Sequence, residues 1–196
     1  IPKDERIITI VDSAELQIKS VPNLVRLEVK NANVEGKHAI TIRDLIRSSL
    51  RMRPDRIIVG EVRDEAAIDM LQALNTGHDG SLSTGHANSP ADMLSRLESL
   101  VLMGCEIPLM AVRRQIASAI DIIVHLGRLR DHTRKVLEIC EVLGCKDDVI
   151  LIQPLYVFKE DSDGGQDKVS GHLVRTEHPL VFTEKLLRAG IKIQDE

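Results

Sequence analysis

The chain is poor in aromatic side chains and in cysteine, and it contains no long hydrophobic run. Aromatic residues make up 2% of its 196 residues, and tryptophan is absent. The core must therefore be aliphatic, and a stacking platform for single-stranded nucleic acid is not expected. Three cysteines do not make a disulfide framework, which favours a reducing compartment such as the cytoplasm. No apolar run approaches the roughly 18 residues of a membrane-spanning helix, and no secretion signal is visible.

The sequence also lacks the loop G-x-x-x-x-G-K-[ST], with which many nucleotide-hydrolysing α/β proteins hold phosphates. Its one Gly-Lys pair is Gly36-Lys37, which is followed by His38, and Asn31 stands where the first glycine belongs. From the residues alone, the chain therefore resembles half of a phosphate-chemistry domain.

The proportions of hydrophobic and charged residues indicate a globular protein. Hydrophobic residues make up 43% and charged residues 29% of the chain, which excludes a disordered or collagen-like protein. Lys and Arg number 26 against 30 Asp and Glu, giving a formal net charge of −4. This mildly acidic balance disfavours bulk binding of nucleic acid.

Short β-branched runs alternate with helical patterns over the first 120 residues or so. Strands are predicted at 6–11, 24–30, 56–60 and 81–84, and helices are predicted from Thr41, at 65–75, at 89–103 and after Pro108. This alternation is typical of an α/β domain with a largely parallel sheet. The segments 121–126, 134–143 and 148–158 predict added antiparallel strands. We therefore expect an α/β core over 1–158, a flexible charged linker over 159–171, and a tail over 172–196 with a short helix.

Polar residues follow three of the predicted parallel strands, where ligands bind in open α/β sheets. Asp12 and Glu15 follow the first strand, Glu61 follows RIIVG, and His86 follows SLST. If these strands are neighbours, carboxylates and an imidazole meet in one crevice. Such a group suits a divalent cation, activation of water, or charge on a phosphoryl group.

Simpler interpretations of the same residues remain open at this point. Asp12 and Glu15 are also ordinary turn residues, Glu61 is also suited to cap the next helix, and His78 and His86 are also suited to a surface turn. Arg43, Arg47 and Arg51, spaced four apart, indicate either a solvated helix face or a set of phosphate contacts.

Three segments closely resemble the type II/IV secretion ATPases, and among them the CpaF-like motors of tight-adherence (Flp) pili. They are RIITIVDSAELQI (6–18), TIRDLIRSSLRMRPDRIIVGEVRDEAAIDMLQALNTGHDGSLSTGHANSP (41–90) and SRLESLVLM (95–103). The likeness extends to FTEKLLRAGIKI (182–193) and so covers nearly the whole chain. It implies the C-terminal portion of a RecA-like P-loop NTPase core, assembled as a hexameric ring that uses ATP and Mg²⁺.

The resemblance also implies roles for individual residues. Asp12 and Glu15 fall in an acidic box, and Glu61 falls at the glutamate of an atypical Walker B motif. There Glu61 would hold Mg²⁺, directly or through water, and polarise the attacking water. His78 and His86 fall in a histidine box expected near the γ-phosphate and a subunit interface. The nucleotide-binding arginines would come from an arginine-rich stretch that contains Arg43, Arg47, Arg51 and Arg53.

The chain departs from this family pattern at two places. The family usually has Glu-Asp where this chain has Val11-Asp12, so catalysis is impaired here or falls to Glu15 or Glu61 if that glutamate is the base. The phosphate loop is expected shortly upstream of Ile1, so we expect a portion of a longer protein that does not hydrolyse ATP well by itself.

The resulting hypothesis is a motor ATPase that drives pilus assembly or type II/IV protein secretion. Its expected partners are copies of itself and platform proteins of the inner membrane, at whose cytoplasmic face it would lie. Nucleic acid is not an expected partner. The alternatives are a non-catalytic interaction module of a secretion machine and a RecA-like nucleic-acid translocase, which the low aromatic content disfavours.

Overall fold

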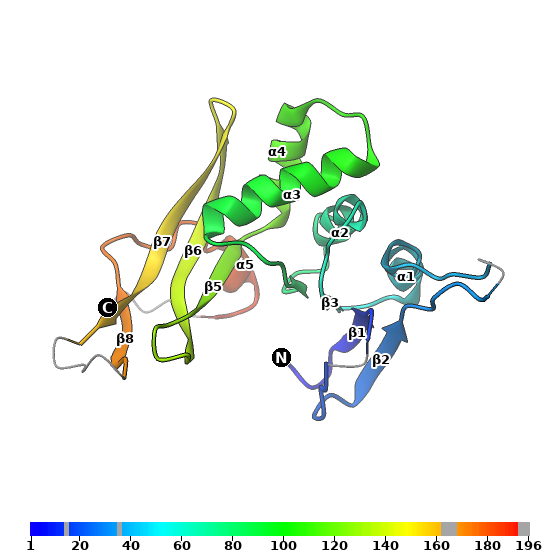
Figure 1. Cartoon of the computed structure of the whole chain (residues 1–196), viewed down its shortest axis with the longest axis horizontal. Coiled ribbons are helices and arrows are strands. Elements are labelled where there is room, and N and C mark those ends of the chain that lie inside the picture. Colours follow the sequence, from blue (N-terminus) through cyan, green and yellow to red (C-terminus); the bar gives the residue numbers. More distant parts are fainter. Residues whose placement is uncertain (14–15, 35–36, 162–167, 192–196) are drawn as a thin grey trace. The chain divides into compact units, whose positions relative to one another are not determined.

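The computed structural model describes residues 1–13, 16–34, 37–161 and 168–191, and the chain divides into two compact units (Figure 1). The first unit comprises Ile1–Asn88 and Asp92–Ala119, and the second comprises Ser89–Ala91 and Ile120–Glu196. Each unit has its own four-stranded sheet. In the described ranges, no helix is both long and apolar enough to cross a membrane.

The first unit is built on a parallel sheet, as the alternation of strand and helix patterns predicted. Its strands lie in the order β2-β1-β3-β4, and every neighbouring pair is parallel. β1 contributes three fully buried isoleucines and so forms the apolar centre of the sheet. The strand bounds are β1 (Arg6–Val11), β2 (Asn23–Glu28), β3 (Arg56–Val59) and β4 (Leu82–Ser83).

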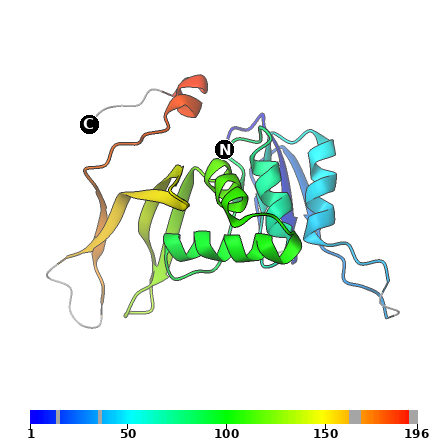
Figure 2. The same ribbon diagram turned by 90° about the horizontal axis from the view of Figure 1, so that it is seen from above.

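Four α-helices and one 3₁₀ turn lie in the described part of the first unit, apart from the first two residues of the third helix, Pro90 and Ala91, which fall in the second unit. Figures 1 and 2 show α1 and α2 side by side over one face of the parallel sheet. The elements are α1 (Ile42–Ser49), the 3₁₀ turn η1 (Leu50–Met52), α2 (Ala66–Leu74), α3 (Pro90–Gly104) and α4 (Leu109–Ala119).

Helix α1, which the sequence predicted from Thr41, begins at a capping box. The Asp44 backbone N–H donates to Thr41 Oγ1 at 3.2 Å, and the Thr41 backbone N–H donates to Asp44 Oδ2 at 2.9 Å. The second of these hydrogen bonds lowers the pKa of Asp44, because it stabilises the ionised carboxylate. The cap therefore satisfies exposed amides of the first turn and places a negative charge at the helix start.

The second unit contains the predicted antiparallel strands and one strand that the sequence did not predict. β5 (Ile122–Arg128), β6 (Arg134–Lys146), β7 (Val149–Glu160) and β8 (Gly171–Arg175) form an antiparallel sheet in that order. The short helix α5 (Glu184–Arg188) lies in the tail over 172–196, where the sequence predicted a short helix.

β8 lies where the sequence predicted only the end of a linker and the start of a tail. Residues 162–167 of the predicted linker lie outside the described residues, but Lys159 and Glu160 belong to β7 and Gly171 begins β8. β8 gains its backbone hydrogen bonds from β7, a partner that a five-residue segment cannot reveal by its own pattern. The division into units at residue 119 follows packing, and the ATPase-core boundary at residue 158 stays a prediction.

Candidate functional site

The register of the parallel sheet brings the carboxyl ends of β1 and β3 together. Ile10 pairs with Val59, and the Gly60 backbone N–H donates to the Ile10 carbonyl at 2.8 Å. The approach is close, because a Cβ added at Gly60 would lie 2.9 Å from Val11 Cγ1. The next residues, Asp12 and Glu61, therefore leave the sheet at neighbouring points, as the sequence predicted.

The loop that follows β4 joins the same edge of the sheet. The Thr84 hydroxyl donates to the Gly60 carbonyl, and the Val62 backbone N–H donates to the Thr84 carbonyl at 3.4 Å. These contacts bring His86 to Glu61, with 3.3 Å between His86 Nε2 and Glu61 Oε1. The carboxylate of the β3 loop and the imidazole of the β4 loop thus meet.

Arg63 ties both carboxylates of this edge into one group. Its Nη2 lies 2.5 Å from Glu61 Oε2, and its Nη1 lies 3.5 Å from Asp12 Oδ2. The Glu61 side chain is 11% exposed, whereas that of His86 is 80% exposed. We call Asp12, Glu61, Arg63 and His86 the carboxyl-edge cluster.

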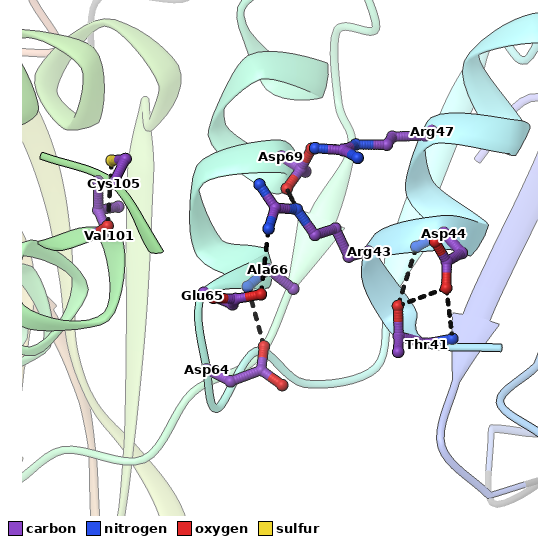
Figure 3. Close-up of polar contacts among 10 residues, drawn as sticks. All are labelled: Thr41, Arg43, Asp44, Arg47, Asp64, Glu65, Ala66, Asp69, Val101 and Cys105. Carbon is purple, nitrogen blue, oxygen red and sulfur yellow. Dashed lines mark hydrogen bonds and ion pairs between the residues drawn. The ribbon is translucent and has the colours of Figure 1, made fainter. Parts of the chain in front are cut away.

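Three of the four predicted catalytic residues therefore lie in one cluster, and the fourth, Glu15, lies outside the described residues. The alternative that Glu61 caps the next helix is not what the structure shows. The Ala66 backbone N–H at the start of α2 donates to Asp64 Oδ1, at 2.9 Å (Figure 3). Glu61 instead pairs with Arg63 and His86.

His78 is not brought to this cluster. It precedes β4, and its turn contacts the start of β3, where Arg56 Nη1 donates to the Gly80 carbonyl at 2.9 Å and the Ile57 backbone N–H donates to Ser81 Oγ at 3.0 Å. The His78 Nδ1 atom lies 3.1 Å from the Ala73 carbonyl. His78 and His86 therefore lie toward opposite ends of β4, because one precedes and the other follows this strand.

Two predicted nucleotide-binding arginines, Arg43 and Arg47, face α2. In Figure 3, both reach from α1 to Asp69, with 2.6 Å from Arg43 Nε to Asp69 Oδ2 and 2.7 Å from Arg47 Nε to Asp69 Oδ1. Arg43 also pairs with Glu65 at 3.0 Å. The pKa of Arg43 is raised, chiefly by the charge of Asp69.

This arginine face is therefore paired with carboxylates rather than simply solvated, and Asp69 is only 5% exposed. Arg51, in η1, and Arg53, which follows η1 in the left-handed region at φ 53°, are both exposed. Neither of these two arginines forms an ion pair with the part of the chain that the structure describes.

The sequence interpretation missed Arg63 and Asp69, and both had a local signal. Arg63 lies two residues beyond Glu61, and residues at this spacing share a side of the backbone in the extended chain that follows a strand pattern. Glu65 and Asp69 lie four apart on a helix, opposite in charge to Arg43 and Arg47 at the same spacing. The pair of arginines and the pair of acidic residues come into contact only because α1 packs against α2.

The chain belongs to the family described as type II/IV secretion system protein, whose model matches residues 1–171. A putative conjugal transfer protein of Mycobacterium tuberculosis is 45% identical over 169 residues, which are 86% of this chain and 47% of that protein. The protein VirB11 of Agrobacterium fabrum is 42% identical over 127 residues, 63% of this chain and 36% of that protein. The chain thus spans about half the length, or less, of these curated relatives.

A solved structure supports the same assignment. The VirB11 ATPase of the Brucella suis type IV secretion system, crystallised with sulphate, matches with a TM-score of 0.63 and 35% identity. The match covers 71% of this chain and 40% of that protein. The predicted fold class, an α/β protein of the RecA-like ATPase type with a parallel sheet and added antiparallel strands, is confirmed.

Proposed function

We propose that this chain is part of a motor ATPase of a secretion or conjugation system, and that the carboxyl-edge cluster is its site of phosphoryl transfer. The observation that carries the proposal is the meeting of Asp12, Glu61 and His86 at the carboxyl edge of a parallel sheet. This edge is where open α/β sheets bind ligands. Membership of the secretion family supports the same assignment.

ATP and Mg²⁺ are the proposed cofactors. The described residues hold no group of three or more His, Cys, Asp or Glu side chains arranged for a metal ion. Mg²⁺ is commonly held by one or two protein carboxylates together with phosphate oxygens and water, so Glu61 and Asp12 fit it as a donor pair. The Arg63 guanidinium contacts both carboxylates, which supports a cation as their ligand. Bound there, the ion would neutralise charge on the transferring phosphoryl group.

Three residues of the cluster have distinct proposed tasks. Glu61, shielded from solvent, orients the attacking water or a water on Mg²⁺, and Asp12 adds a second carboxylate to the same edge. His86 is exposed and within reach of Glu61, so it is placed to contact a phosphate oxygen. Glu15 stays a candidate for an additional acidic group. His78, Arg51 and Arg53 stay candidates for nucleotide contacts, and Arg43 and Arg47 would have to leave Asp69 to make such contacts.

The test is ATP turnover by a longer version of the protein that includes a phosphate loop. Replacement Glu61→Gln is expected to lower kcat by at least about 100-fold, because a group positioned for proton transfer contributes about this much. Replacement Glu106→Gln, at an exposed position of the same unit, is the matched control and should leave turnover unchanged. Unchanged turnover in the Glu61 variant would remove this residue from the reaction.

A non-catalytic interaction module is the second candidate, and Val11 favours it. This side chain is 9% exposed and apolar at the place where the family usually has an acidic residue. Because the chain also has no G-x-x-x-x-G-K-[ST] loop, we propose that the 196 residues alone do not turn over ATP at a useful rate. Measurable turnover by these 196 residues would contradict this.

The oligomeric state and the subcellular location are proposals as well. We propose a hexameric ring, lying at the cytoplasmic face of a membrane and acting on platform proteins of a pilus or secretion system. The CpaF-like branch stays a hypothesis, because the relatives reported above are conjugal transfer and VirB11 proteins. Sedimentation of the longer protein with and without nucleotide tests the ring.

A further inference from the structure

We propose that Arg63 is a built-in counter-cation that closes the carboxyl-edge cluster, and that it must leave Glu61 and Asp12 before a divalent cation can bind between them. The inference rests on the proposed function, since it concerns the same two carboxylates. Arg63 then holds the carboxylates of Glu61 and Asp12 in place, and its guanidinium competes with a divalent cation for them.

The contacts of Arg63 are those of a cation shared between two acids. Both its Nε and its Nη2 face Glu61 Oε2, at 2.6 Å and 2.5 Å. Its other terminal nitrogen, Nη1, lies 3.5 Å from Asp12 Oδ2. The guanidinium therefore occupies the side of Glu61 that faces the β1 loop, while His86 occupies the other carboxylate oxygen.

The positions of the carboxylates explain why a cation is needed there. Asp12 and Glu61 directly follow the paired ends of β1 and β3, so the sheet holds two negative charges at adjacent points. Two carboxylates at close range destabilise each other's ionised forms unless a positive charge compensates. Arg63 supplies this charge from the same loop as Glu61.

The exposed fractions of the three side chains differ widely. Arg63 is 63% exposed and Asp12 is 45% exposed, whereas Glu61 is 11% exposed. Because exposed ion pairs contribute little to stability, moving the Arg63 guanidinium away from the two carboxylates costs little free energy in those two contacts. Glu61 lies two residues beyond the buried strand β3, and its side chain is largely enclosed, so moving it would disturb more of its surroundings.

The consequence is a measurable competition. The two carboxylates present the oxygen ligands that Mg²⁺ and Mn²⁺ prefer, but an entering ion must first displace the guanidinium. The affinity of the chain for a divalent cation in the absence of nucleotide is therefore lower than it would be without the Arg63 contacts. Removing the arginine charge should strengthen binding of the ion, which is the opposite of what loss of a metal ligand does.

The experiment measures Mn²⁺ binding to the 196-residue chain without nucleotide, from the electron paramagnetic resonance signal of free Mn²⁺. Replacement Arg63→Gln is expected to tighten binding about fivefold, the equivalent of one partly exposed ion pair. Replacement Arg63→Lys retains the charge and should stay close to the original affinity. Replacement Arg114→Gln, which removes an exposed arginine of α4, is the control for net charge.

Three results would overturn the inference. They are an affinity of the Arg63→Gln chain that is unchanged or weaker, an equal gain in the Arg114→Gln chain, and a gain that survives when Glu61→Gln is added. If Arg63→Gln does not fold, as judged by circular dichroism, Arg63→Met provides a second neutral side chain of similar length for the same comparison.

The outcome is distinguishable from failure of the proposed function. Mn²⁺ binding is measured without ATP, whereas the proposed function is tested by turnover of a longer protein. Tighter binding by Arg63→Gln, together with undiminished turnover by Glu61→Gln, would retain the closed cluster and reject the catalytic role. The reverse pair of results would retain the catalytic role and reject the closure by Arg63.

Discussion

At the scale of single residues, hydrogen bonds and neighbouring charges decide what each carboxylate does. Glu61 was recognised from the sequence because it directly follows a predicted buried strand, and in the structure its carboxylate contacts Arg63 and His86. Asp131 carried no comparable signal, since an aspartate in a turn is ordinary. Its oxygens nevertheless accept from the Thr133 backbone N–H and hydroxyl, at 3.0 Å and 2.7 Å, and from the Val169 backbone N–H, at 2.9 Å.

These hydrogen bonds, of which the one from the Thr133 hydroxyl is the strongest, lower the pKa of Asp131 to about 2. A pKa lowered from 3.8 by folding means that the ionised form stabilises the protein above about pH 4, and this contribution is lost as the pH falls through about 2. We therefore expect Asp131→Asn to lower the free energy of unfolding at pH 6 and to have much less effect near pH 2.

Urea unfolding of both chains, followed by circular dichroism at the two pH values, measures this difference. Replacement Thr133→Val removes one donor and should reduce the dependence on pH without abolishing it. An Asp131→Asn chain that is destabilised equally at pH 6 and pH 2 would contradict the argument, because its loss would then not depend on ionisation.

At the scale of elements, two complementary pairs of charges join α1 to α2. The arginine spacing on α1 was visible in the sequence, but its partners on α2 were not recognised until the helices were seen packed. Asp69 lies between Arg43 and Arg47 and is almost fully buried. A buried carboxylate of this kind stabilises the folded protein only while its cationic partners remain.

Replacement Asp69→Asn is expected to destabilise the first unit by about 2 kcal/mol, because both arginines lose the charge that they face and the site stays polar. Replacement Arg47→Met should cost less, since Arg43 remains and the Arg47 side chain is 57% exposed. Thermal unfolding measures both effects, with Asp4→Asn as an exposed control. An Arg47→Met effect larger than that of Asp69→Asn would contradict this order.

At the scale of the whole molecule, contacts between distant segments give each unit its form. In the second unit, Glu141 of β6 is 1% exposed, and its carboxylate accepts from the backbone N–H groups of Val181 and Phe182. Gln153 Nε2 donates both to Glu141 Oε2 and to the Pro179 carbonyl, each at 2.8 Å. A single buried carboxylate thus holds a segment 40 residues further along the chain.

Replacement Glu141→Ala is expected to release residues 177–191, because their amides lose a buried acceptor. Hydrogen exchange at these amides should accelerate by at least about tenfold, and Glu141→Gln should give a smaller increase, since its amide oxygen still accepts. Replacement Glu177→Ala, at an exposed position of the same segment, is the control. Unchanged exchange in the Glu141→Ala chain would show that other contacts hold the segment.

The sequence by itself determined the helices, all the described strands except β8, and the residues that follow the parallel strands, because these depend on local periodicity, capping and chain direction. It also carried the family, through motifs of fixed spacing. Only the tertiary structure decided that β1 lies between β2 and β3, that β8 is a strand, that His78 and His86 lie apart, and that Arg63 closes the carboxylate pair. Apart from the contact between Arg63 and Glu61, which are two residues apart, these features depend on partners far away in the chain. Neither hydrogen-bond pairing nor charge compensation between such distant partners leaves a mark on the local pattern.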